Sequence, residues 1–180
     1  MPTVLSHAAV PLALGLGLGG KVIPGRLLLA GVAASILPDL DVVAFKFHIA
    51  YADVFGHRGA SHSLLFAVCV ALLAVACVRY LKASRWSAFV FVAVSAASHG
   101  ILDSLTNGGL GPALWWPFSS GRVFAPWQVI EVSPLTLQRI FSARGWAVLQ
   151  SELFWIWLPA LHVCAGLILL RHCAFNRSAG

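Results

Sequence analysis

The chain has 180 residues, of which 59% are hydrophobic and only 10% are charged, and its formal net charge is +6. Soluble domains are about 45–50% apolar and about 25% charged, so this chain has too few polar side chains to cover a soluble protein. The composition predicts a single all-α integral membrane domain over residues 1–180. The basic residues lie between apolar segments, which favours contact with membrane lipids and their anionic headgroups and argues against nucleic acid.

Apolar segments recur along the chain, and there are five of them: residues 3–20, 27–45, 62–81, 86–105 and 153–171. Each approaches the length of about 20 residues that a helix needs to cross a bilayer. Helices are expected because lipid offers no hydrogen-bond partner to an unpaired backbone group. We therefore predict a polytopic membrane helix bundle with about five transmembrane helices.

The first segment contains an isolated histidine, His7, and ends in the glycine-rich run 15–20. The spacing of these glycines fits a dinucleotide-binding loop, but such a loop requires a preceding strand and a soluble parallel sheet. Gly15 and Gly19 are therefore expected at a close contact between helices. His7 has two interpretations, a hydrogen bond between helices or a metal ligand.

The second segment ends in Pro38-Asp39-Leu40-Asp41. Residues two apart on a continuous helix face away from each other. Because Pro38 disturbs a helix, both carboxylates can point inward if the backbone turns there. Otherwise one carboxylate binds a metal and the other orients a histidine. Two solvated acids at an ordinary helix end are the remaining alternative.

A polar run from His57 to Ser63 precedes the apolar part of the third segment. His62 is the preferred ligand in this run, and His57 is either a second ligand or an acid–base group. The guanidinium of Arg58 is suited to a phosphate. Ser61 is expected to cap a helix that begins at His62. The alternative is a polar loop with a capping serine and no site.

The fourth segment carries His99 and Asp103, which are four residues apart and therefore share one helix face. Imidazole and carboxylate groups that converge in this way suit a divalent cation such as zinc. The alternative is a hydrogen bond between packed helices. Ser98 beside His99 also suggests a serine hydrolase, but the chain has no G-x-S-x-G motif.

Residues 106–151 are predicted to form an interfacial loop that covers the site, with a short helix near 134–142. Tryptophan and other amphipathic aromatic residues favour the membrane–water interface. Glu152 begins the fifth segment and is a further ligand, a general base, or a favourable carboxylate at a helix N-terminus. The aromatic residues of the loop are Trp115, Trp116, Phe118, Phe124, Trp127 and Trp146.

The basic residues also predict an orientation. In a five-helix topology one side of the membrane receives Lys21, Arg26, Arg79, Lys82, Arg85, Arg171 and Arg177. The positive-inside rule makes that side cytoplasmic. Every candidate ligand then falls on the outer side at a similar depth. We therefore predict that the candidate ligands meet in one cluster.

The combination of these motifs resembles the YdjM family, which are membrane-bound, metal-dependent bacterial hydrolases named for an association with the LexA repressor. The resemblance covers most of the chain and implies an inner-membrane hydrolase of phospholipase type. The order of histidine and aspartate is also similar to zinc-dependent phospholipase C, but the absence of a second His-x-x-x-Glu leaves one or two metals. The residues that carry the resemblance to the YdjM family are His7, Pro38-Asp39-x-Asp41, 57–63, His99-x-x-x-Asp103, Ser133-Pro134 and Glu152.

These observations and the resemblance lead to one hypothesis, a multi-pass inner-membrane hydrolase for a lipid or lipid-linked phosphoester. Arg58 or Arg122 would hold the anionic headgroup. The alternatives are a transporter for metal ions or protons, and a non-catalytic protein whose metal only joins the helices. The expected metal ligands, for one or two divalent ions, are His7, Asp39, His62, His99 and Asp103. The expected catalytic residues are His57, Arg58, Asp41 and Glu152.

Overall fold

The computed structural model describes residues 1–133 and 142–178, and this part of the chain is helical with no strand. An isolated bridge joins Thr106 to Ile130. The α-helices are α1 (Val4–His7), α2 (Ala9–Leu18), α3 (Gly25–Ile36), α4 (Leu64–Ala76), α5 (Val78–Leu81), α6 (Arg85–Ser104), α7 (Ala143–Glu152) and α8 (Leu158–Ser178). The remaining elements are the 3-10 helices η1 (Leu37–Phe47) and η2 (Ala60–His62) and the π-helical segment η4 (Leu153–Trp157). The predicted all-α fold is confirmed.

Within the described residues, three helices are long and apolar enough to cross a membrane: Gly25–Phe47, Arg85–Ser104 and Ala143–Ala174. Two shorter apolar helices, Val4–Leu18 and Leu64–Ala76, accompany them. The prediction of about five transmembrane helices is therefore not confirmed. The third apolar segment yields a short helix because α4 starts only at Leu64 and ends at Ala76, and the four residues of α5 follow after Cys77.

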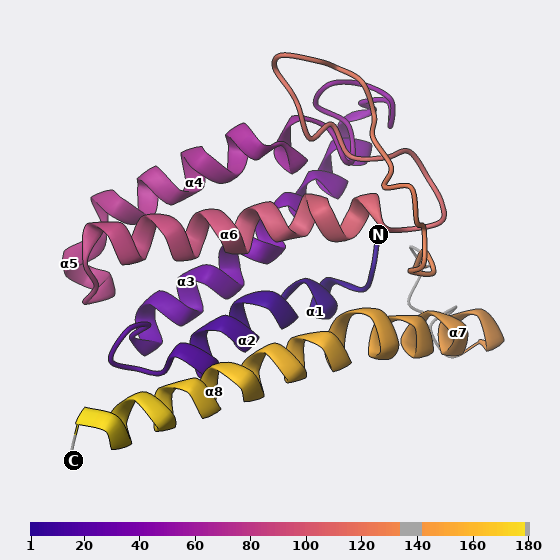
Figure 1. Cartoon of the computed structure of the whole chain (residues 1–180). Helices are drawn as coiled ribbons and strands as arrows, with labels where there is room; N and C mark the ends of the chain where they lie inside the picture. The colour runs from indigo at the N-terminus through magenta and orange to yellow at the C-terminus, as the bar shows by residue number, and fades with distance from the viewer. Residues whose placement is uncertain (134–141, 179–180) are drawn as a thin grey trace.

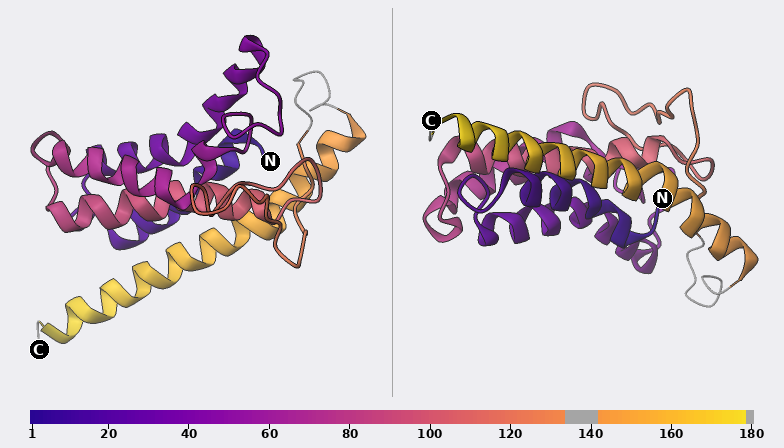
Figure 2. Two further views of the ribbon diagram at one scale, coloured as in Figure 1. Left: turned by 90° about the horizontal axis from the view of Figure 1, so that it is seen from above. Right: turned by 60° about the horizontal axis from the view of Figure 1, so that its bottom comes forward.

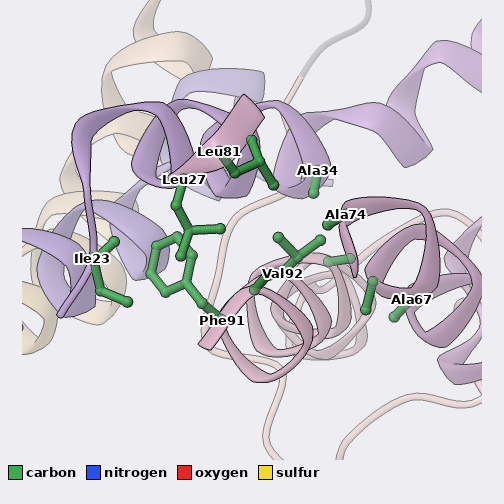
Figure 3. Close-up of a cluster of buried hydrophobic side chains, with 11 residues drawn as sticks. Ile23, Leu27, Ala34, Ala67, Ala74, Leu81, Phe91 and Val92 are labelled. Atoms are coloured by element: carbon green, nitrogen blue, oxygen red, sulfur yellow. The ribbon is translucent and has the colours of Figure 1, made fainter. Parts of the chain in front are cut away.

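Helix α6 lies at the centre of the bundle, between α3 and α4, while α2 packs against α8 (Figure 1). Alanines let these helices approach closely. Ala67, Ala71 and Ala74 recur on one face of α4 and are buried with Ala88 and Val92 of α6 (Figure 3). Packing of small residues is the usual way in which helices associate in a membrane, where the hydrophobic effect does not drive their contact.

The glycine-rich end of the first segment lies at helix contacts, as its sequence predicts. A Cβ atom at Gly15 would lie 2.5 Å from Leu28 of α3, and one at Gly17 would lie 2.8 Å from Leu167 of α8. Gly19 ends α2 with a φ of 80°, a conformation that glycine adopts without strain. Helix α2 is thereby held between α3 and α8.

The last helix begins earlier than its sequence predicts. Helix α7, η4 and α8 follow one another without a break from Ala143, and the Ser142 side chain accepts a hydrogen bond from Gly145 N. The predicted loop 106–151 therefore ends near residue 142, and Glu152 lies inside this helical run. Helix α7 mixes polar and apolar residues, so its sequence lacks the apolar signal of a membrane span. The short helix predicted near 134–142 lies outside the described residues, apart from Ser142.

The two ends of the bundle differ in structure. The loop end holds η1, η2 and the irregular segment 105–133, and the N-terminus lies beside it (Figure 1). The opposite end, called the basic end below, holds the turn between α2 and α3, helix α5 and the C-terminal part of α8 (Figure 1, Figure 2). The polar residues singled out in the sequence divide between these two ends.

Candidate metal centre

Four buried side chains from three elements meet at the loop end of the bundle. Asp39 lies on η1, His62 on η2, and His99 and Asp103 on α6. Each offers one ligand atom, and these atoms lie within 4.8 Å of one another. The His62 and His99 Nε2 atoms are 3.0 Å apart. We call these four residues the His–Asp cluster.

His7 is the neighbour of this cluster at the end of α1. Its ring stacks on His99 with centroids 3.7 Å apart and an interplanar angle of 16°. The Nε2 atoms of His7, His62 and His99 each lie 3.2–3.9 Å from a carboxylate oxygen of both Asp39 and Asp103. Three imidazoles therefore surround two carboxylates, although His7 is not one of the four closest ligands.

The carboxylates of the cluster have an unusual environment. Both oxygens of Asp39 and Asp103 are buried, and no hydrogen bond reaches them within residues 1–133 and 142–178. Both ring nitrogens of His7 also lack a hydrogen bond there. Removing a carboxylate from water costs several kcal/mol. A cation or a set of hydrogen bonds must offset this cost. A divalent cation fits this set of nitrogen and oxygen donors, which zinc binds in many proteins.

The tautomer of His99 is set by the backbone of α3. His99 Nδ1 lies 2.7 Å from the carbonyl oxygen of Ser35, and because a carbonyl only accepts, Nδ1 carries the proton. The lone pair on Nε2 then faces the carboxylates. Metal-binding histidines are commonly oriented in this way by a partner on the other ring nitrogen.

His62 is oriented by Asp41. His62 Nδ1 lies 3.2 Å from Asp41 Oδ2, and Nε2 faces the cluster. Burial lowers the pKa of His62, but the nearby Asp103 and Asp41 carboxylates outweigh burial and raise that pKa to about 9. The surrounding carboxylates therefore favour positive charge at this point.

The two aspartates of the second segment take different positions. Asp39 faces the cluster, whereas Asp41 faces the turn 57–62 and is bound by His57 Nδ1 at 2.5 Å, Arg58 N at 3.0 Å and Ser61 Oγ at 2.6 Å. The 3-10 geometry of η1, about three residues per turn, separates side chains two apart. Of the two predicted arrangements, the structure has the one in which a single aspartate joins the cluster. Asp41, His57 and His62 nevertheless form a second group that satisfies metal-ligand spacing.

Ser61 does not cap the third helix, so this expectation is wrong. Helix α4 begins at Leu64, and its cap is Ser63, whose Oγ accepts a hydrogen bond from Phe66 N at 3.0 Å. Ser61 lies one turn earlier and donates to Asp41 instead. The reason is that residues 60–62 form a 3-10 turn and not the first turn of the helix.

Arg58 has internal partners in place of the predicted phosphate. Its side chain is fully buried, with Nε 3.1 Å from Asp103 Oδ2. Its Nη1 atom donates to the carbonyls of Gly108 and Leu110, and its Nη2 atom donates to Thr106 Oγ1. The φ of Arg58 is 63°, a conformation that costs a residue with a side chain about 1–3 kcal/mol. Arg58 therefore fastens residues 106–110 to the cluster.

Arg122, the second predicted headgroup ligand, also has protein partners. It donates to the backbone carbonyls of Tyr51, Asp53 and His57. Burial lowers the pKa of Arg122 below its ordinary value. This arginine secures the turn that carries His57, and the structure thus supports neither arginine as a ligand of a substrate phosphate.

Glu152 is buried but does not belong to the cluster. Its carboxylate accepts hydrogen bonds from the Thr3 backbone N–H, from Thr3 Oγ1 at 2.7 Å and from Ser6 Oγ at 2.8 Å. These contacts join the end of α7 to the start of α1, the helix that carries His7. The structure thus gives Glu152 a role in positioning the N-terminal turn and supports neither metal ligation nor general base catalysis.

Some residues at the site were not anticipated. A Cβ atom at Gly100 would lie 2.6 Å from the His62 carbonyl oxygen, so this glycine allows α6 to approach η2. The glycine beside His99 is a signal for such a contact. The Ser35 carbonyl and Thr106 give no comparable signal, because a backbone carbonyl has no residue preference and Thr106 acts through a distant arginine.

Comparison with known proteins identifies the family. The model of the family described as "YdjM inner membrane protein" matches residues 1–176. The chain belongs to this family. It is also 54% identical over 162 residues to the inner membrane protein YbcI of Escherichia coli strain K12. The aligned region covers 89% of this chain and 94% of YbcI. No solved structure matches the chain at a significant level.

The family membership confirms the resemblance that the motifs indicate. The description of the family, the name of the E. coli relative and the apolar helices together support a location in the inner membrane. The His–Asp cluster lies within the matched residues, so it is a feature of a YdjM-family chain.

Proposed function

We propose that this protein is a membrane-bound, metal-dependent hydrolase. The observation that carries this proposal is the set of three imidazole Nε2 atoms that lie 3.2–3.9 Å from two buried carboxylates without hydrogen bonds. Asp39, His62, His99 and Asp103 would hold the metal, with His7 beside them. Zinc is the proposed ion, because imidazole and carboxylate donors together suit it.

A divalent cation held there would lower the pKa of a bound water toward about 7 and polarise a phosphoryl oxygen. Hydrolysis of a phosphoester then forms a bond from the water oxygen to phosphorus and breaks the bond to the alcohol. One proton must pass from the water to the departing alcohol. His57 is the proposed proton carrier, because Asp41 accepts its Nδ1–H at 2.5 Å and orients the ring.

The proposed substrate is a lipid or lipid-linked phosphoester. The His–Asp cluster lies at the end of apolar helices, and Arg58 attaches the segment 106–110 directly to it. The same segment continues into exposed aromatic residues, with exposed fractions of 55% for Trp115, 91% for Phe118 and 73% for Trp127. Exposed aromatic rings of this kind favour the headgroup region of a bilayer. The basic residues of the opposite end argue that the cluster faces the periplasm.

A metal that only joins the helices is the second candidate. The burial of all four cluster residues favours it, since a structural metal has a closed ligand shell whereas a catalytic metal keeps one position for water. Both candidates require the same metal ligands, but only the catalytic one predicts that the protein hydrolyses a substrate.

The test combines metal analysis with hydrolysis of the detergent-purified full chain. The wild type should hold one or two zinc ions. The metal content of His99→Ala should be at least about tenfold lower. His57→Gln should keep the metal but should no longer hydrolyse a panel of phospholipids and polyprenyl phosphoesters. His162→Ala is the control, because His162 is exposed on α8 and its hydrogen bond in the described part of the chain is to the Leu158 carbonyl. Unchanged metal content in His99→Ala would refute the site, and metal binding without hydrolysis would favour the structural role.

A further inference from the structure

A second candidate site lies at the basic end of the bundle. A cavity of about 720 Å³ is lined by the turn between α2 and α3 and by the C-terminal part of α8. Pockets that bind small ligands have similar volumes, about 300–1,000 Å³. The residues that line it include Gly19, Gly20, Lys21, Val22, Arg171 and His172.

Two glycines shape one wall of this cavity. A Cβ atom at Gly19 would collide with the Arg171 guanidinium, so the absence of a side chain lets that guanidinium lie against the turn. At Gly20 a Cβ atom would meet nothing within 4 Å, which shows that the space beside the turn is open. The cavity is therefore accessible where its cationic groups lie.

Within the described residues, Lys21 and Arg171 of this cavity form no ion pair. The chain has six acidic residues, all within the described part of the chain. Asp39, Asp41, Asp103 and Glu152 are engaged at the loop end, as described above. Asp53 accepts a hydrogen bond from Phe55, and Glu131 pairs with Arg144. Lys21 and Arg171 consequently have no ion pair with any of these carboxylates, and both side chains are exposed.

The surface next to the cavity is apolar. Helix α8 exposes Leu169 by 65% and Leu170 by 68%, and Leu16 of α2 is 56% exposed. Figure 2 shows that α8 runs along the bundle to its C-terminus. Positive side chains thus stand at the end of a hydrocarbon-compatible surface. A free anion needs only the positive groups, whereas a lipid uses both parts.

We propose that this cavity binds the headgroup of an anionic phospholipid, with its phosphate between Lys21 and Arg171 and its acyl chains along α8. Basic pockets between membrane helices bind anionic headgroups by charge attraction together with contact to the chains. His172 is placed to donate a further hydrogen bond. This site is separate from the His–Asp cluster and does not depend on the proposed hydrolase activity.

The test measures lipid binding by the full chain in nanodiscs of phosphatidylcholine that contain a labelled phosphatidylglycerol probe. We expect about fivefold weaker binding of the probe for Lys21→Ala or Arg171→Ala, and on the order of twentyfold weaker binding for the double variant. Arg79→Ala combined with Arg85→Ala is the matched control, since both residues are exposed at the same end and neither lines the cavity.

The outcomes distinguish lipid binding in this cavity from a general attraction of the basic end to anionic lipid. Normal probe binding by the control and weak binding by the cavity variant support the proposal. Equal losses in both would overturn it in favour of general attraction to the bilayer, and no loss in the cavity variant would also overturn it. Inorganic phosphate at millimolar concentration should not displace the probe. Full displacement would show a site for the free anion and refute the lipid assignment.

Discussion

The two ends of the bundle use charge in opposite ways. At the loop end, carboxylates, imidazoles and the Arg58 guanidinium are buried within a few ångströms of one another. At the basic end, Lys21, Arg171 and the neighbouring cations are exposed, and no carboxylate pairs with Lys21 or Arg171 in the described residues. Buried charges must be satisfied within the protein, whereas exposed charges are satisfied by solvent or lipid. Substitutions at the loop end should therefore alter stability and metal binding, and those at the basic end should alter mainly lipid contact.

The largest effect is expected from Arg58→Met. This change removes the cation beside Asp103 and releases the carbonyls of Gly108 and Leu110, so it should lower the free energy of unfolding by about 3–5 kcal/mol. Thermal or denaturant unfolding in detergent measures the loss. Arg79→Met at the basic end is the control and should change stability by less than about 0.5 kcal/mol. Similar losses for the two variants would contradict the contrast between the ends.

An intermediate effect is expected from Asp41→Asn. Asp41 orients His57 and His62 from outside the His–Asp cluster, so its loss should weaken zinc affinity by about 10–100-fold without abolishing binding. Competition with a zinc chelator measures this affinity. Asp53→Asn is the matched control, because Asp53 is exposed in a nearby turn and should leave the affinity unchanged. Complete loss of zinc in Asp41→Asn would instead assign Asp41 as a direct ligand.

The smallest effects are expected from two helix caps, one at each end. Ser63 caps α4 beside His62, and Ser84 caps α6 at the basic end. Replacing either serine by alanine should cost about 1 kcal/mol of stability. Only Ser63→Ala should also weaken zinc binding, since its helix start follows directly on η2. Equal zinc affinity in the two variants would show that the cap does not position His62.

The part of the site that depends on local spacing was predictable from the sequence. His99 and Asp103 share a face because α6 is a regular helix, and the structure brings both into the cluster as expected. The all-helical membrane fold follows from hydropathy in the same way. By contrast, the different directions of Asp39 and Asp41 depend on the 3-10 geometry of η1, which the sequence pattern does not specify.

The parts that depend on distant contacts were not predictable. Arg58 looks like a phosphate ligand in the sequence, but its partners are backbone carbonyls some fifty residues later, and no side-chain pattern marks them. Glu152 similarly bonds to Thr3 and Ser6 across nearly the whole chain. A polar residue in an apolar sequence therefore indicates that a partner exists without identifying it.

X-ray absorption spectroscopy of the zinc-loaded protein tests the central claim most directly. If Asp39, His62, His99 and Asp103 hold the ion, the spectrum should show only nitrogen and oxygen ligands at about 2.0–2.2 Å, with imidazole scattering that falls in His99→Ala. A sulfur ligand at about 2.3 Å, from one of the four cysteines, or a spectrum unchanged in His99→Ala would contradict the assignment.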